Sequence, residues 1–171
     1  RRPVISDDGR WVAYEAIPDS NPLAGLGTRF SLYAYDRVAE TNGLIAGVGK
    51  VSAPSFPVFS QQSGFMAFQS SETGVTRYAT TVGQIYYREL AQNSNRLVSL
   101  NYQGTAAGSA ASSNPAISPD GRYVAYLSSA SGLVTNATSG INAFLWDSVT
   151  GSNIVVSGPG STGCGSIGYG I

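Results

Sequence analysis

The chain has 171 residues, with ten basic and ten acidic side chains and no histidine, so its formal net charge at pH 7 is zero. Charged residues make up 12% of the chain, about half the usual share of roughly 25%. This sparse and balanced charge excludes the basic surface that nucleic-acid binding requires, and no apolar run approaches the length of a membrane-spanning helix.

A twelve-residue pattern occurs three times along the chain. It reads Pro3-Val-Ile-Ser-Asp-Asp-Gly-Arg-Trp-Val-Ala-Tyr14 and returns, in a more divergent form, as Pro57–Phe68 and again, closely matched, as Pro115–Tyr126. Each copy predicts two short strands joined by a tight turn, because aromatic and β-branched residues flank a cluster of turn-forming residues. Self-similarity at this period indicates a repeat architecture.

The turns of the first and third copies contain Asp8-Gly9 and Asp120-Gly121. Asp can cap local backbone groups and Gly accepts a positive φ, so we interpret these four residues as structural turn residues and not as metal ligands or acids. The middle copy supports this interpretation, since its turn keeps Ser63 and Gly64 and has no carboxylate.

A third and a fourth strand are predicted after each copy. The third strands are 32–35, 85–88 and 143–146, each followed by an acid (Asp36, Glu89 and Asp147) that we interpret as a turn initiator. The fourth strands are 44–46, 96–99 and 153–157. The chain therefore divides into three four-stranded units at 3–46, 57–99 and 115–157, followed by a Gly-rich tail or inter-blade linker at 158–171.

The sequence thus predicts an all-β, β-propeller-like array of three four-stranded antiparallel blades. The repeated Pro-x-Ile-Ser-x-Asp-Gly-Arg-aromatic-Val-Ala-Tyr pattern resembles the WD-like β-propeller repeats of the TolB type over residues 3–157. The Trp-Asp ending usual in such repeats occurs once, at Trp146-Asp147. The resemblance implies the propeller fold, and it leaves the function open because propellers serve many functions.

Three long loops are predicted on one face of the array, opposite the Asp-Gly turns. They span 15–29, 69–84 and 127–142, and long loops on a rigid scaffold are typical ligand-binding elements. Three acids near or within these loops (Glu15, Asp19 and Glu72) are weak candidates for a metal site, but their spacing matches no calcium-loop motif. We therefore expect no metal and no cofactor.

The histidine-dependent catalytic arrangements are missing from this sequence. Without histidine there is no Ser-His-Asp or Cys-His arrangement and no imidazole ligand for zinc. The sequence favours a non-enzymatic extracellular structural or binding module that assembles into a ring or filament. The alternative is a propeller segment of a larger secreted enzyme or of a TolB-like accessory protein.

Three blades are too few to close a ring, since propellers typically have four to eight. We therefore expect the end blades to be covered by a second copy of the chain or by other blades of a longer one. The end faces are expected to carry Trp11, Tyr14, Tyr33 and Tyr35 on the first blade and Tyr123, Tyr126, Phe144 and Trp146 on the third, while Ile5 is expected to pack within or between blades.

Two further features concern location and modification. A surface made of neutral polar residues favours a secreted or cell-surface protein, with the bacterial periplasm as the alternative. The single cysteine, Cys164, cannot form an internal disulfide and is either free or an intermolecular link. Asn136-Ala-Thr138 is a glycosylation sequon on a predicted loop.

Overall fold

The computed structural model describes residues 3–17, 30–46, 55–62, 64–136 and 139–157. The prediction of an all-β array of three four-stranded antiparallel sheets is confirmed. Blade 1 contains β1 (Val4–Ile5), β2 (Trp11–Ala16), β3 (Ser31–Asp36) and β4 (Thr41–Ala46). Blade 2 contains β5 (Ser55–Phe59), β6 (Phe65–Ser70), β7 (Gln84–Glu89) and β8 (Ser94–Leu97). Blade 3 contains β9 (Ser112–Ile117), β10 (Tyr123–Ser128), β11 (Asn142–Asp147) and β12 (Asn153–Val155).

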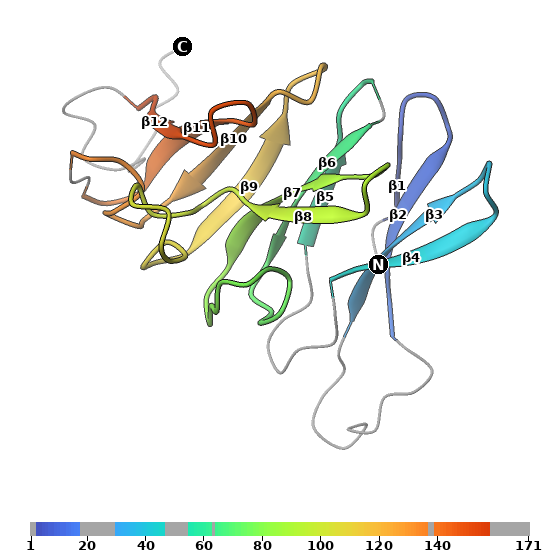
Figure 1. Cartoon of the computed structure of the whole chain (residues 1–171), viewed down its shortest axis with the longest axis horizontal. Coiled ribbons are helices and arrows are strands. Elements are labelled where there is room, and N and C mark those ends of the chain that lie inside the picture. The colour runs from blue at the N-terminus through green and yellow to red at the C-terminus, as the bar shows by residue number, and fades with distance from the viewer. Residues whose placement is uncertain (1–2, 18–29, 47–54, 63, 137–138, 158–171) are drawn as a thin grey trace, which may run out of the picture.

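The three blades stand side by side, with blade 2 in the middle (Figure 1). Each sheet keeps its strands in chain order, so the first and fourth strands form its two edges. The first strands of neighbouring blades contact one another, β1 with β5 and β5 with β9. The described residues contain no helix that is long and apolar enough to span a membrane.

Two hydrophobic cores lie between the blades. The first, between blades 1 and 2, is formed by Ala13, Leu32, Ala34, Ile45, Ala46, Met66, Phe68, Val75, Tyr86 and Leu97. The second, between blades 2 and 3, is formed by Ala67, Ile85, Tyr87, Val98, Val124, Tyr126, Ala130, Leu133, Phe144 and Trp146. Blade 2 is therefore apolar on both of its faces.

Side chains along each strand alternate between the two faces of its blade. In β6, Met66 and Phe68 enter the first core while Ala67 enters the second. Equivalent positions point the same way in every blade: Tyr126 points from blade 3 toward blade 2, as Phe68 points from blade 2 toward blade 1.

The prediction that eight aromatic residues form the two end faces is wrong for four of them. Trp11 packs against the first core, while Tyr126, Phe144 and Trp146 are at most 2% exposed in the second. The expectation that Ile5 packs within or between blades is also wrong, because this side chain is 63% exposed. Its equivalents Phe59 and Ile117 each pack toward the preceding blade, and no described blade precedes blade 1.

The loops expected at 69–84 and 127–142 are shorter than predicted, because the flanking strands extend further, and residues 18–29 of the loop expected at 15–29 lie outside the described residues. Pairing of the second and third strands continues to Ala16↔Ser31, Ser70↔Gln84 and Ser128↔Asn142. Polar residues continue these strands because other groups of the protein form hydrogen bonds with their side chains. Gln84 Nε2, for example, donates to the Gly108 carbonyl oxygen at 2.9 Å. Glu15 consequently lies in β2 and not in a loop.

The first strands of blades 2 and 3 also begin earlier than predicted. The predicted starts were the prolines of the repeat, but β5 begins at Ser55 and β9 at Ser112. In both strands the residue before the proline, Phe56 or Asn114, has a φ of 56°, and the pairing register shifts at this point. A bulge thus lets the strand continue past a residue that usually marks its start.

Candidate functional site

The carboxylates of the Asp-Gly turns bind the turns themselves. Asp8 Oδ1 accepts hydrogen bonds from Ser6 Oγ at 2.6 Å and from the Arg10 amide at 3.0 Å. Asp120 Oδ1 makes the equivalent bonds to Ser118 Oγ at 2.5 Å and to the Arg122 amide at 3.0 Å. The glycines that follow have φ values of 66° at Gly9 and 76° at Gly121, a region that glycine enters at little cost.

The acids that end the third strands do more than begin a turn. Arg10 binds Asp36 through Nε and Nη2, at 3.1 and 2.7 Å, and Arg122 binds Asp147 in the same way at 3.3 and 2.8 Å. These forked ion pairs tie the turn before the second strand to the end of the third strand. Blade 2 has Gly64 at the arginine position and lacks the pair.

Acid should weaken blade 1 through Asp36. The hydrogen bond from Arg10 is the main reason that the pKa of this carboxyl falls to about 2, whereas an unfolded Asp titrates at roughly 3.9. A depressed folded-state pKa adds stability that is present above the unfolded pKa and is lost as pH falls through the folded one. We expect the melting temperature to drop between about pH 4 and pH 2, and to drop less in Asp36→Asn. Thermal melts across this range test the expectation, and an equal drop in both proteins would contradict it. The matched control is Asp7→Asn, which changes an exposed acid in the turn between β1 and β2.

The three loop acids are not gathered in the described structure. Glu15 is half-buried in β2, Glu72 is only 1% exposed, and Asp19 lies outside the described residues. Burial raises the pKa of the Tyr86 hydroxyl to about 12, and the charge of Glu72 adds to the rise. Within the described ranges, no three acid, cysteine or histidine side chains lie close enough to hold a metal ion.

Two adjoining hollows form a groove where the outer edges of blades 2 and 3 meet. One, of about 480 Å³, is lined by Thr76, Arg77, Tyr78, Asn95, Arg96, Leu97, Leu100, Trp146 and Gly151. The other, of about 370 Å³, is lined by Leu100, Asn101, Tyr102, Gly104, Leu133, Val134, Thr135 and Thr150–Asn153. We call the pair the rim groove. The predicted loops 69–84 and 127–142 contribute to it, as do β8, β12 and the link after β8.

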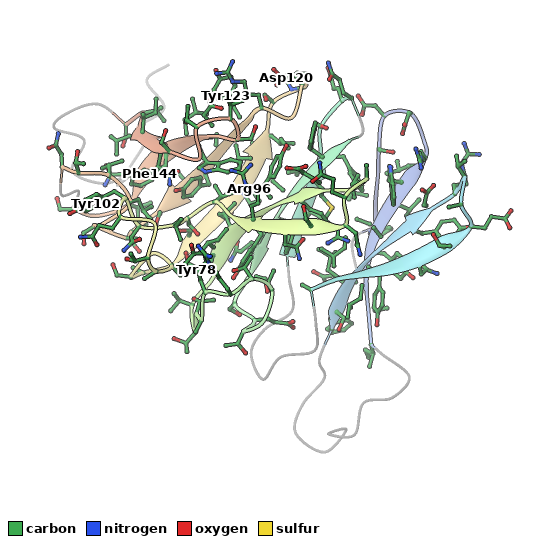
Figure 2. All side chains as sticks on the ribbon, in the orientation of Figure 1. Tyr78, Arg96, Tyr102, Asp120, Tyr123 and Phe144 are labelled. Atoms are coloured by element: carbon green, nitrogen blue, oxygen red, sulfur yellow. The ribbon has the colours of Figure 1, made fainter. Side chains whose placement is uncertain are left out.

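The rim groove offers aromatic and cationic contacts. Tyr102 is 55% exposed, and the Tyr78 hydroxyl donates to the Gly104 carbonyl oxygen at 3.0 Å. The Arg96 guanidinium lies over the Trp146 ring, 4.9 Å from its centroid. Figure 2 shows Tyr78 at the opposite end of the blades from Asp120, so the Tyr78 end of the groove lies apart from the Asp-Gly turn of blade 3. Among the residues that the structure describes, no acid, histidine or cysteine lines either hollow.

A third hollow, of about 240 Å³, lies between blades 1 and 2 beside Trp11 and Arg88. Arg88 is only 4% exposed, and burial lowers the pKa of its guanidinium. Its nitrogens donate to the side-chain oxygens of Asn95, at 2.9 Å, and of Asn93. Arg88 thus stands at the blade 1–blade 2 boundary and is bound by neutral amides.

Two asparagines outside the predicted site residues join neighbouring blades. Asn95 Nδ2 donates to the Ile45 carbonyl oxygen of blade 1 at 2.9 Å, and Asn153 Nδ2 donates to the Val98 carbonyl oxygen of blade 2 at 3.0 Å. Both residues hold the same place in the fourth strand, and Asn42 holds it in blade 1. This recurrence is visible in the sequence, but a polar residue beside a turn is predicted there to be a solvated surface residue.

No protein-family model and no curated protein sequence matches the chain. Several solved structures are similar to it in fold. Dipeptidyl peptidase 4 of Porphyromonas gingivalis is 14% identical with a TM-score of 0.60, over 93% of this chain and 26% of that one. The β-propeller domain of the Trilobed protease from Pyrococcus furiosus is 13% identical with a TM-score of 0.58, over 90% and 41%. An oligogalacturonate lyase in complex with manganese is 12% identical with a TM-score of 0.57, over 91% and 40%.

The chain spans less than half the length of each of these three proteins. They include two proteases and a lyase, so a shared fold does not carry one activity. The similarity supports a β-propeller fold. It does not show that the chain belongs to the TolB-type family. The fold of this chain is that of a β-propeller array.

Proposed function

We propose that this chain is a non-catalytic propeller segment of a larger protein, in which it supplies scaffold and binding surface. The observation that carries the proposal is the pair of uncovered faces at the two ends of the array. Ile5 and Leu44 on the outer face of blade 1 are 63% and 51% exposed, and Ile154 on the outer face of blade 3 is 56% exposed. Soluble proteins seldom leave such apolar sheet faces uncovered, so further blades would cover them.

The described polar groups support a structural role. The turn carboxylates are bound by backbone amides and arginines, and the rim groove offers cations, hydroxyls and aromatic rings without a group suited to proton transfer near neutral pH. If the larger protein is an enzyme, its catalytic groups would lie outside these blades. The small share of each similar structure that the chain spans also supports a segment.

We include in the proposal a secreted or cell-surface location, with the periplasm as the alternative. The support is compositional: charged residues are 12% of the chain, and neutral polar side chains carry much of the solvated surface. The rim groove is the binding surface that we propose for this segment, because it combines exposed tyrosine with two arginines.

The size of the native polypeptide tests the proposal. An antibody raised against the chain should detect a species clearly larger than its 17.7 kDa on a denaturing gel of the source cells and their medium. The gel is run under reducing conditions so that Cys164 cannot link copies. Peptide mapping of that species should find sequence outside these 171 residues. A native polypeptide of 17.7 kDa would overturn the proposal.

A further inference from the structure

We propose that the outer face of blade 1 binds the outer face of blade 3 in a second copy of this chain, head to tail. The head face carries Ile5, Val12, Tyr14, Tyr33, Tyr35 and Leu44, and the tail face carries Tyr123, Ala125, Ala143, Leu145, Ile154 and Val156. The inference rests on the proposed function only in that both require the end faces to be covered. Where the 171-residue chain stands alone, without the further blades of the larger protein, a second copy covers them.

The head face repeats a surface that is buried twice within the molecule. Each blade stacks two aromatic rings on the side that faces the preceding blade: Phe68 on Tyr86 with centroids 5.4 Å apart, and Tyr126 on Phe144 at 5.6 Å. These four side chains are at most 2% exposed. The equivalent pair in blade 1, Tyr14 on Tyr33, stacks at 5.7 Å and is only half-buried. Blade 1 is thus built to receive a blade as blades 2 and 3 are.

A hydrogen-bonding group on the head face is already oriented. The Tyr14 hydroxyl donates to Asn42 Oδ1 at 2.9 Å, as the Tyr126 hydroxyl donates to Asn153 Oδ1 at 2.9 Å. In Asn153 this leaves Nδ2 to bind the Val98 carbonyl of the preceding blade. Within the described part of the chain, Nδ2 of Asn42 meets no such carbonyl.

The tail face presents the matching acceptor. Val156 follows Asn153 by the same interval that separates Val98 from Asn95. The amides of both valines bind the third strand alike, Val98 to the Ile85 carbonyl at 2.8 Å and Val156 to the Ala143 carbonyl at 2.9 Å. Val98 is 0% exposed beneath blade 3, whereas Val156 is 52% exposed. Its carbonyl therefore occupies the position that would accept a hydrogen bond from Asn42.

One chain thus carries both halves of the interface that joins its own blades. The tail face of a second copy has the residue pattern, the alternation of apolar side chains and the carbonyl position that the head face requires. The contact is heterologous, so it either closes into a ring or propagates as a filament.

Sedimentation velocity and light scattering on the 171-residue chain test the proposal. We expect masses at multiples of 17.7 kDa that rise with protein concentration. Leu44→Arg on the head face and Ile154→Arg on the tail face, where the residues are 51% and 56% exposed, should each give a monomer. Asn42→Asp, which removes the amide donor, should weaken association roughly tenfold.

Mixing separates a head-to-tail contact from a symmetric one. The Leu44→Arg chain keeps its tail and the Ile154→Arg chain keeps its head, so an equal mixture should form a dimer of twice 17.7 kDa and nothing larger. Val38→Arg and Val149→Arg, exposed turn positions at 71% and 74%, are matched controls that should associate like the unaltered chain.

Three results would overturn the inference: a monomeric unaltered chain at all concentrations, a single-face variant that still associates alone, or a mixture that stays monomeric. Circular dichroism must show the same β spectrum for every variant. Should Leu44→Arg fail this check, Tyr33→Glu replaces it on the same face, and a failed Ile154→Arg is replaced by Leu145→Arg. A monomeric chain with a larger native polypeptide would overturn this inference and leave the proposed function standing.

Discussion

Replacing Tyr126 with alanine should lower the free energy of unfolding by about 3–5 kcal/mol, the range for truncating a large buried aromatic side chain. Tyr126 is 2% exposed, stacks on Phe144, and donates through its hydroxyl to Asn153 Oδ1. Asn153 in turn donates to the Val98 carbonyl. The substitution therefore opens a cavity and releases the asparagine that joins blades 2 and 3. Urea melts followed by circular dichroism measure the loss.

The matched comparison is Tyr14→Ala. Tyr14 holds the equivalent place in blade 1, with the same stacking partner position and the same bond to an asparagine, but it is only half-buried. We expect a loss of roughly 1 kcal/mol, the central value for point substitutions. The melts should be run at concentrations where the chain is monomeric, since head-to-tail association would bury Tyr14. Equal losses at both sites would mean that the order of the blades is wrong.

The repeating pattern was enough to predict the strands and their grouping. The Asp-Gly turns set the first two strands of blades 1 and 3, because only a few residue types form such a turn. The divergent turn of blade 2 still folds as a hairpin, in which the Ser60 amide donates to the Phe65 carbonyl at 3.0 Å. Strand ends were predicted less well, because Ser128 and Gln84 extend strands through hydrogen bonds that a sequence does not display.

The facing of side chains was predicted only in part. Alternation places Tyr126 and Phe68 on corresponding faces, but a sequence does not say whether that face meets the preceding or the following blade. Repetition nevertheless sets a limit: if Tyr14 is at one open end, its equivalent Tyr126 must be inside. The prediction that Tyr126 lies on an end face was therefore wrong.

The polar contacts between elements were the least predictable part of the candidate site. Asp36 and Asp147 appear in the sequence as turn initiators, and their hydrogen bonds from the Val38 and Val149 amides, at 2.9 and 2.8 Å, agree with that role. Their ion pairs with Arg10 and Arg122 depend on strand pairing that brings together residues more than twenty positions apart. The rim groove likewise arises where a link, two strands and two loops meet, so no local pattern marks it.

A second large effect is expected at Gly121. This glycine is buried with a φ of 76°, and a Cβ at this position would overlap the ring of Phe65 in blade 2. The ring has little freedom to move, because it stacks on Tyr87 with centroids 5.5 Å apart. A left-handed backbone costs a non-glycine residue about 1–2 kcal/mol, and overpacking adds about 1–3 kcal/mol. Gly121→Ala should therefore destabilise the protein by about 2–5 kcal/mol.

Gly9→Ala separates the two contributions. Gly9 holds the same turn position in blade 1 with a φ of 66°, and no atom lies within 4 Å of an added Cβ. Only the backbone cost of about 1–2 kcal/mol applies there, so urea melts of the two variants should differ by the overlap with Phe65. The double variant Gly121→Ala/Phe65→Ala should lose less stability than the sum of the losses in the two single variants, because the clash disappears with the Phe65 ring. Equal losses at Gly9 and Gly121, or no such coupling, would show that the turn of blade 3 does not pack against blade 2. The hydrogen bond that the Gln62 amide donates to the Pro119 carbonyl oxygen, at 3.1 Å, would then be absent as well.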